Sequence, residues 1–282
     1  MSEASAEAER QAADRGGKAQ GLLAGFGRVL QAGRNAGVAA FSLALPPTCP
    51  SCDRLIAGGE ALCPRCWAET PFLAPPWCER LGVPFAYDLG EGAVSPSAIA
   101  RPPVFGRLRS VAAHDGPARI LVSRLKYHDH PFAARMMGRW MARVGAELLA
   151  AGAEEAGPPL VVPVPLHRLR HWSRRYNQAA LLARHAAQAA GAEVAPFALA
   201  RRRATKRQVG LDAAARARNV RGAFVATRDG SMRMTGRRVV LVDDVYTTGA
   251  TVEAAARAVL RGGAASVDVL TFAHAGAETP IG

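Results

Sequence analysis

One segment near the C-terminus, Val239–Thr251, constrains the fold and the chemistry of this chain more than any other. It opens with four apolar, mostly β-branched residues, Val239–Val242, a run typical of a buried strand in a parallel sheet. Two carboxylates follow, Asp243 and Asp244, at the carboxyl end of that strand, where open α/β sheets bind ligands. The segment therefore predicts a ligand site at the edge of a parallel sheet.

The residues after the acidic pair favour a phosphate as part of that ligand. The turn consists of Thr247, Thr248, Gly249, Ala250 and Thr251, and a helix is expected to begin at about Thr251. Backbone N–H groups at a helix start, beside threonine hydroxyls, form a phosphate cradle. Carboxylates next to it suit sugar hydroxyls or a hydrated Mg²⁺. The combination predicts a site for a phosphorylated ribose.

Other proteins also place two acidic residues after a buried strand, including nucleoside-triphosphatases and response regulators. The chain has no G-x-x-x-x-G-K-[ST] stretch, so the nucleoside-triphosphatase interpretation lacks its phosphate loop. A structural coincidence is the remaining alternative, and the unbroken order of strand, acidic pair and T-T-G-x-T turn disfavours it.

The charge of the chain is concentrated in its middle. The formal net charge is +13 over 282 residues, and residues 161–238 hold 17 Lys and Arg against 3 Asp and Glu. A basic segment that leads into the predicted ligand site indicates a polyanionic ligand. Phosphoribosyl pyrophosphate (PRPP) and nucleic acid both fit that description, and charge does not choose between them.

The N-terminal sequence predicts neither secretion nor membrane insertion. Its first residues are acidic and polar, unlike a secretory signal. The longest apolar stretch, about residues 36–47, is too short to cross a bilayer. We expect a cytoplasmic protein, in which cysteines more often bind metal than form disulfides.

Four cysteines follow the spacing of a zinc site: Cys49, Cys52, Cys63 and Cys66 form C-x₂-C-x₁₀-C-x₂-C. Each pair closes a tight knuckle, and two knuckles complete a tetrahedral Cys₄ site. Four thiolates leave no open position, so the predicted Zn²⁺ is structural rather than catalytic. The alternative is four reduced, unligated thiols. Cys78 is expected to be a buried or idle thiol rather than a fifth ligand.

Composition and periodicity divide the chain into five predicted parts. These are a disordered tail over 1–20, an amphipathic helix over 21–45, a zinc-ribbon-like module over 46–80, a connector over 81–106 and an α/β domain over 107–275. Helices are predicted over about 117–127, 132–149 and 177–190 and from Thr251. Strands are predicted at Ser110–His114, Leu160–Pro165, Val194–Leu199, Phe224–Ala226, Arg238–Val242 and Val267–Phe272. This alternation predicts a doubly wound parallel sheet.

The segment Val239–Thr251 resembles the PRPP motif of type I phosphoribosyltransferases. Residues 45–273 as a whole resemble the ComF family, whose members pair a small zinc-ribbon-like module with a type I phosphoribosyltransferase domain. The supporting blocks are Leu125–Tyr127, Val162–His167, Arg174–Gln178, Arg201–Leu211 and Arg216–Val220. The resemblance implies a type I phosphoribosyltransferase fold, a parallel sheet flanked by helices, after a Cys₄ module.

The resemblance also implies roles for individual residues. Asp243 and Asp244 would orient the ribose hydroxyls, and Thr247–Thr251 would bind the 5′-phosphate. A pyrophosphate loop would include Pro165, Leu166, His167, Arg168 and Arg174, with Mg²⁺ accompanying the diphosphate. A flexible lid from Arg201 to Gln208 would bring Lys206 or Arg207 to the leaving pyrophosphate. The implied reaction transfers a phosphoribosyl group to a nitrogen acceptor with release of pyrophosphate.

Two positions depart from the family pattern. Cys78 stands where members often open a second set of zinc ligands, but Leu81 occupies the next ligand position and no later Cys follows. A second zinc is therefore not expected. Arg175 stands where the string R-G-F-N-Q commonly has Gly.

Two alternatives to an enzyme stay open at this point. ComF relatives are associated with DNA uptake during natural transformation, which implies a nucleic-acid handling protein that contacts single-stranded DNA or the uptake machinery. Some members of the wider superfamily bind PRPP or nucleotides as regulators without catalysis. Either alternative is compatible with an oligomer.

Overall fold

The structure is a computed structural model of the 282-residue chain, and it describes residues 47–58, 61–127, 132–150, 157–166, 176–202 and 222–277. The tail over 1–20 and the helix over 21–45 predicted above lie outside these ranges. Two compact units are distinguished, Met1–Thr48 with Leu55–Gly59, and Cys49–Arg54 with Glu60–Gly282. The fold described below belongs to the second unit.

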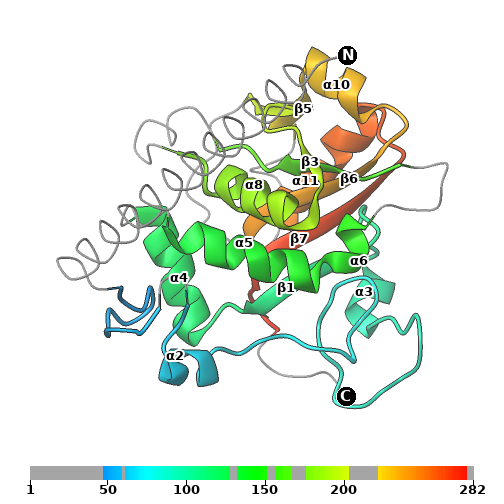
Figure 1. Ribbon diagram of the computed structural model, residues 1–282. Helices are drawn as coiled ribbons and strands as arrows, with labels where there is room; N and C mark the ends of the chain where they lie inside the picture. The colour runs from blue at the N-terminus through cyan, green and yellow to red at the C-terminus, as the bar shows by residue number, and fades with distance from the viewer. Residues whose placement is uncertain are drawn as a thin grey trace, which may run out of the picture. The chain divides into compact units, whose positions relative to one another are not determined.

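The centre of this unit is a parallel sheet, as the sequence predicts, and it contains five of the strands (Figure 1). Its spatial order is β1 (Leu108–Ala113), β7 (Ser266–His274), β6 (Arg238–Tyr246), β2 (Leu160–Pro163) and β3 (Glu193–Val194). β1 and β2 are buried along their whole length. Both strands are covered on the two faces of the sheet, which is the usual environment of parallel strands.

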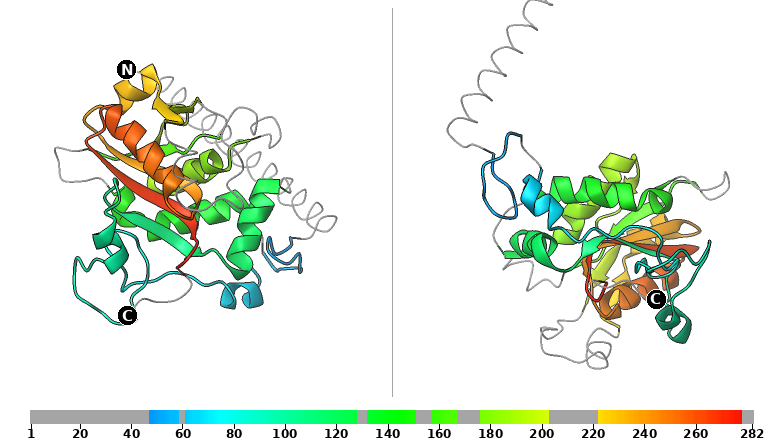
Figure 2. Two further views of the ribbon diagram at one scale, coloured as in Figure 1. Left: turned by 180° about the vertical axis from the view of Figure 1, so that it is seen from behind. Right: turned by 90° about the horizontal axis from the view of Figure 1, so that it is seen from below.

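Helices cover both faces of the sheet (Figures 1 and 2). α5 (Phe132–Val144) and α8 (Gln178–Ala190) lie together on one face, and α11 (Ala250–Arg261) lies on the other, in front of the sheet in the left view of Figure 2. α5 and α8 approach closely because Gly138 has no side chain: a Cβ there would lie 2.5 Å from the Cβ of His185. The helix pair thereby seals one face of the core.

The predicted helices agree with the structure except at one break. α4 (Gly116–Tyr127), α8 and α11 lie where the periodicity places them. The helix predicted over 132–149 is divided at Gly145 into α5 and the short α6 (Ala146–Leu149). A Cβ at Gly145 would lie 2.8 Å from Cδ1 of Leu270, so the close approach to the sheet requires glycine at this break.

The strand predicted over Val194–Leu199 is wrong as a single element. It is divided into β3 and β4 (Leu199–Arg201), because Pro196 has no N–H with which to continue the ladder. β4 pairs antiparallel with β5 (Phe224–Ala226) in a separate two-stranded sheet. α10 (Arg228–Met234) follows β5, with Thr227 as its N-cap. The segment between β4 and β5 contains the predicted lid.

The segment before β1 is folded around its own hydrogen bonds. It contains two short helices, α2 (Pro64–Ala68) and α3 (Pro96–Ala100). Phe72 forms an antiparallel bridge with Ala112, which attaches this segment to the outer edge of β1. Within the described residues, no helix is both long and apolar enough to cross a membrane.

Candidate functional site

The acidic pair lies at the point where the strand order reverses. From β2 the chain proceeds to β3 on one side, and the later strand β6 lies on the other side of β2. Open α/β sheets bind ligands in the crevice at such a switch point. Pairing between β2 and β6 ends when the Val164 N–H donates to the carbonyl of Val242, 2.9 Å. Asp243 follows directly, so it lies at the switch point, just beyond the last residue of β6 that pairs with β2.

The predicted end of the β6 strand at Val242 is correct only on the β2 side. Beside β7 the strand continues through the acidic pair to Tyr246, with Asp243 opposite Thr271 and Tyr246 opposite His274. β7 is long enough to continue the ladder, whereas the chain leaves β2 after Pro163. The acidic residues therefore have a regular strand backbone on one side and an open edge on the other.

A lysine from α4 contacts the acidic pair. Nζ of Lys126 lies 3.1 Å from Oδ1 of Asp244, and both side chains are largely buried. The Asp244 N–H donates to Oδ1 of Asp243, 2.9 Å. Burial and the neighbouring charge of Asp244 raise the pKa of Asp243 to about 7, although Lys126 and Arg201 act in the opposite direction. The pair thus combines an ion-paired carboxylate with one that takes up a proton near neutral pH.

The helix that follows offers its N-terminus to a ligand. Gly249, with a φ of 76°, occupies the N-cap of α11, and as a glycine it has no side chain with which to cap the helix. A Cβ at Gly249 would lie 2.5 Å from the Tyr246 hydroxyl, so glycine is required by both space and backbone. Thr247 and Thr248 are exposed beside it. First-turn N–H groups without an internal partner are suited to a phosphate.

The other predicted ligand-binding residues are only partly described. Pro165 and Leu166 follow β2 and are half-buried beside the open edge of β6. His167, Arg168 and Arg174 of the predicted pyrophosphate loop lie outside the described residues, as do Lys206 and Arg207 of the predicted lid. At the base of that lid, Arg201 ends β4 and its guanidinium lies 5.2 Å from the centre of the Phe224 ring. The charge of Arg201 reaches Asp243, where it lowers the carboxyl pKa.

Three further residues belong to this site that sequence reasoning did not assign to it. They are Lys126, Tyr176, whose hydroxyl donates to the carbonyl of Leu125 at 3.0 Å, and Asn177, whose Nδ2 donates to the carbonyl of Val164 at 3.2 Å. Asn177 also caps α8. The blocks Leu125–Tyr127 and Arg174–Gln178 signalled the family, but nothing in them showed which partner each side chain would meet.

The four predicted metal ligands meet in one cluster. The sulfur atoms of Cys49, Cys52, Cys63 and Cys66 all lie within 4.8 Å of one another, and those of Cys52 and Cys63 are 3.7 Å apart. A tetrahedral Zn²⁺ with Zn–S bonds of about 2.3 Å separates its sulfur ligands by roughly 3.8 Å. The Cys63 N–H also points to the Cys49 sulfur, 3.4 Å. The thiol set fits a structural Zn²⁺ in number, chemistry and spacing.

Local backbone geometry creates this cluster. In the first knuckle, the Cys49 N–H donates to the carbonyl of Arg54 and the Asp53 N–H donates back to the carbonyl of Cys49. Asp53 has a φ of 60°, which allows the chain to turn back after Cys52. In the second knuckle, Cys63 is the N-cap of α2 and its sulfur accepts the N–H of Cys66. Cys78 lies outside this cluster.

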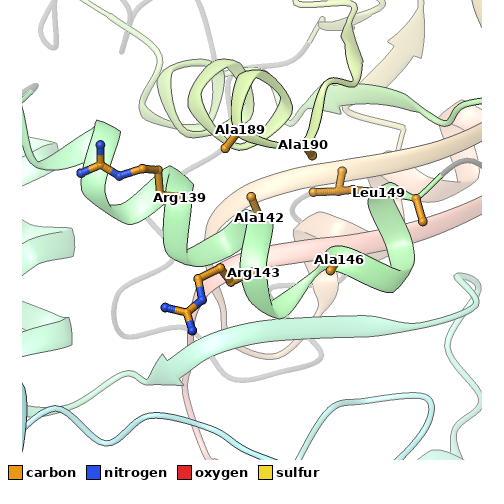
Figure 3. Close-up of a pocket in the computed structure, with 8 residues that line it drawn as sticks. Arg139, Ala142, Arg143, Ala146, Leu149, Ala189 and Ala190 are labelled. Carbon is orange, nitrogen blue, oxygen red and sulfur yellow. The ribbon is translucent and has the colours of Figure 1, made fainter.

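A groove of about 500 Å³ lies between α5, α6 and α8 (Figure 3). Its walls are mainly alanines, and Figure 3 shows the Arg139 and Arg143 guanidinium groups pointing away from them. α8 begins at the carboxyl edge of the sheet, where Asn177 contacts Val164, so its final residues in the groove lie toward the opposite edge. The groove is therefore separate from the acidic pair.

Comparison with known families gives two matches, a double zinc ribbon domain over residues 40–97 and a phosphoribosyl transferase domain over residues 178–280. One solved structure, the allosteric regulatory enzyme of purine biosynthesis, is 24% identical and covers 53% of this chain and 30% of its own, with a TM-score of 0.32. The assignment of the fold rests on the family match and the strand order.

Similarity to curated proteins extends over most of the chain. DNA utilization protein YhgH of Salmonella typhi is 33% identical over 224 residues, which cover 78% of this chain and 87% of that protein. Competence protein F of Haemophilus influenzae is 27% identical over 223 residues, which cover 77% of this chain and 91% of that protein. With its cysteine cluster, its parallel sheet and the acidic pair at the switch point, this chain belongs to the ComF family.

Proposed function

We propose that this protein binds PRPP with Mg²⁺ and transfers its phosphoribosyl group to a nitrogen acceptor. The observation that carries the proposal is the placement of Asp243 and Asp244 at the switch point, followed by the N-terminus of α11, whose N-cap residue Gly249 has no side chain to cap it. Carboxylates suit the ribose hydroxyls and helix N–H groups suit the 5′-phosphate. A cytoplasmic location is part of the proposal, because thiolate metal ligands need a reducing compartment.

The chain supplies binding and charge for this reaction. The acceptor nitrogen forms a bond to the anomeric carbon as the bond to the pyrophosphate oxygen breaks, and pyrophosphate leaves with the electron pair. The acceptor proton is lost to solvent or to the leaving group. Mg²⁺ would arrive with PRPP and neutralise the diphosphate. Catalysis then depends on positioning and on stabilising the developing charge.

Each predicted residue has a place in that scheme. The acidic pair would accept hydrogen bonds from the ribose 2′- and 3′-hydroxyls, and Thr247–Thr251 would hold the 5′-phosphate. The loop after β2, which continues from Leu166 to His167, Arg168 and Arg174, would face the diphosphate. Lys206 or Arg207 would approach the leaving pyrophosphate when the lid between β4 and β5 closes.

Calorimetric titration of PRPP with Mg²⁺ tests the proposal directly. We expect micromolar binding by the zinc-loaded wild type and its loss in Asp243→Asn/Asp244→Asn. Asp229→Asn is the matched control, because it makes the same chemical change in the exposed first turn of α10. Binding that survives in the double variant, or no binding by the wild type, would contradict the proposal. Detected binding justifies a screen of nitrogen acceptors for pyrophosphate release.

The pKa of Asp243, raised to about 7 by burial and by Asp244, adds a pH signature. The folded protein binds this proton more tightly than the unfolded chain does. The stability that this proton contributes is present below the ordinary carboxyl pKa and is lost as pH rises through about 7. Asp243→Asn removes this loss of stability, so the free energy of unfolding of the variant should exceed that of the wild type by roughly 4 kcal/mol at pH 8. The two proteins should converge near pH 4 in thermal melts.

A second candidate function, nucleic-acid handling, is favoured by one surface. α5 carries exposed arginines at every fourth position, Arg135, Arg139 and Arg143, and has no carboxylate. α8, packed against it, adds exposed Arg184 and also has no carboxylate. Such a face suits a phosphate backbone. The names of the relatives, DNA utilization protein and competence protein, agree with this candidate.

Gel retardation of single-stranded DNA distinguishes this candidate from the first. If α5 binds DNA, Arg139→Gln/Arg143→Gln should weaken retardation and reduce its salt dependence. The Asp243→Asn/Asp244→Asn variant should retain DNA binding in that case. DNA binding that disappears only in the acidic-pair variant would instead assign the nucleic acid to the PRPP site.

A further inference from the structure

We infer that helix α4 couples the cysteine cluster to the acidic pair, so that the Asp53–Arg124 contact and the metal beside it set the affinity of the acidic site for PRPP. The inference rests on the proposed function and adds regulation of the same site. Arg124 and Lys126 are positioning residues in this scheme, because each acts through a partner on another segment.

The first contact lies at the cysteine cluster. Nη1 and Nη2 of Arg124 donate to Oδ1 and Oδ2 of Asp53, each at 2.5 Å. Asp53 directly follows the metal ligand Cys52. A guanidinium that donates to both oxygens of a carboxylate fixes the relative orientation of the two side chains as well as the distance between them. The position of α4 is therefore tied to the knuckle that holds the metal.

The backbone at Asp53 shows what this side chain adds. Its φ of 60° is a conformation that glycine adopts without strain and that aspartate adopts less readily. The equivalent turn after Cys78 has glycine, Gly82, with the same φ of 60°. The bidentate contact with Arg124 is an interaction that a glycine at this turn could not make.

The second contact lies at the acidic pair. Lys126 is two residues beyond Arg124, so the two side chains leave α4 in nearly opposite directions, at 100° per residue. Nζ of Lys126 reaches Asp244 at 3.1 Å. Between them, Leu125 is fully buried and its carbonyl accepts the Tyr176 hydroxyl at 3.0 Å. One helical turn thus carries contacts to the cluster, the core and the acidic pair.

The body of α4 is packed well enough to transmit a displacement. Its inward residues are fully or almost fully buried: Ala118, Leu121, Val122 and Leu125. A packed helix moves as a unit rather than bending within a turn. Loss of the metal or of the Asp53 carboxylate releases the outer side of that turn, and Lys126 then holds Asp244 less firmly. If the Asp244 carboxylate has to be ordered when the ligand binds, the entropy lost weakens the affinity of the site for the ribose hydroxyls.

The test measures PRPP affinity and zinc content together. Asp53→Asn removes the charge but tolerates the left-handed backbone, and Asp53→Gly copies the turn at Gly82. Both variants should retain about one zinc per chain, as a single Cys₄ site requires. Both should bind PRPP about tenfold more weakly than the wild type, a typical size for coupling between sites. Arg65→Gln is the control, because it breaks the ion pair between Arg65 of α2 and Glu69, the C-cap of that helix, in the same module.

Two further measurements exclude a general loss of structure. If Asp53 acts through Lys126, the double variant Asp53→Asn/Lys126→Ala should bind PRPP no more weakly than Lys126→Ala alone. Coupling between sites is also reciprocal, so PRPP should protect zinc from a competing chelator by the same factor in the wild type, and not in Asp53→Asn. Lys126→Arg should restore part of the affinity.

The outcomes separate this inference from the proposed function. A wild type that binds PRPP and an Asp53→Asn variant that binds it equally well would overturn the coupling alone. Additive losses in the double variant would overturn the route through Lys126. A zinc-loaded wild type without PRPP affinity would overturn the proposed function and the coupling together.

Discussion

The segment around the cysteine cluster and the segment around Cys78 have the same pattern of backbone hydrogen bonds, but different side chains pack inside each of them. In the first, the N–H of Cys49 donates to residue 54 and that of residue 53 donates back to Cys49. In the second, the N–H of Cys78 donates to Val83 and that of Gly82 donates back to Cys78. The sulfur of Cys49 accepts the N–H of Cys63, 3.4 Å, and that of Cys78 accepts the N–H of Ser95, 3.2 Å.

We call residues 49–68 the first ribbon and residues 78–100 the second ribbon. The similarity between the two continues into the second half of each ribbon. Cys63 is the N-cap of α2, and Ser95 is the N-cap of α3, each followed by proline at the first helical position. The four ligand positions of the first ribbon therefore correspond to Cys78, Leu81, Ser95 and Ala98 in the second.

The two ribbons show that one backbone can be held by different interactions. The first ribbon turns four thiols toward one point. The second packs Cys78 and Ala98 against Phe85, with Leu81 beside them. Three of the four ligand positions no longer offer a thiol, and apolar contact replaces the metal. Backbone N–H groups still donate to the sulfur of Cys78, and most of the second ribbon lies within the double zinc ribbon match over residues 40–97.

The largest expected effect is loss of the first ribbon when its metal is removed. Cys63→Ser leaves three thiolates and should reduce the zinc content from about one per chain to none, because a structural site needs all four ligands. The binding energy of structural zinc is folding energy, on the order of 10 kcal/mol, so residues 49–68 should lose amide protection in hydrogen exchange. A variant that retains zinc and protection would show that the cluster is held without metal.

The converse change should convert the second ribbon into a metal site. Leu81→Cys/Ser95→Cys/Ala98→Cys restores the ligand pattern around Cys78, and zinc analysis should rise to about two per chain. The gain in stability should be smaller than the loss above, since the apolar packing of Leu81 and Ala98 is given up. Unchanged zinc content in a folded triple variant would contradict the correspondence between the two ribbons.

Phe85 should stabilise the second ribbon, as the metal is expected to stabilise the first. Its side chain is 6% exposed and packs against Cys78 and Ala98. Phe85→Ala should lower the free energy of unfolding by about 3 kcal/mol through lost burial and a cavity. Zinc content should not change. The control is Tyr87→Ala, at a residue 72% exposed in the same ribbon, which should cost little in thermal melts.

The smallest effect is expected at Cys78 itself. Cys78→Ser replaces the sulfur that accepts the N–H groups of Leu81 and Ser95 by a smaller and more polar atom. We expect a loss of about 1 kcal/mol in denaturant unfolding, with zinc content unchanged. A Cys78→Ser protein that releases zinc would make Cys78 part of the metal site and would end the distinction between the ribbons.

Much of the fold and half of the candidate site could be predicted from local patterns. The C-x₂-C pairs, the strand with its acidic pair and the amphipathic stripe of α5 all lie within short windows, where spacing and periodicity reflect backbone geometry. In the second ribbon, the family resemblance located the first two ligand positions, Cys78 and Leu81, but it did not locate Ser95 and Ala98, because neither of these positions is a cysteine. The strand over 194–199 was overextended because its apolar pattern concealed the effect of Pro196.

The sequence by itself determined which chemical groups this protein carries: four thiols spaced for a metal, and two carboxylates before a turn that is predicted to bind a phosphate. The tertiary structure decided which distant groups meet that chemistry. It brought Lys126 to Asp244, joined Arg124 to Asp53 and placed β2 beside β6 at the switch point. Such contacts depend on how helices and strands pack, and packing joins segments whose separation along the chain leaves no periodic signal.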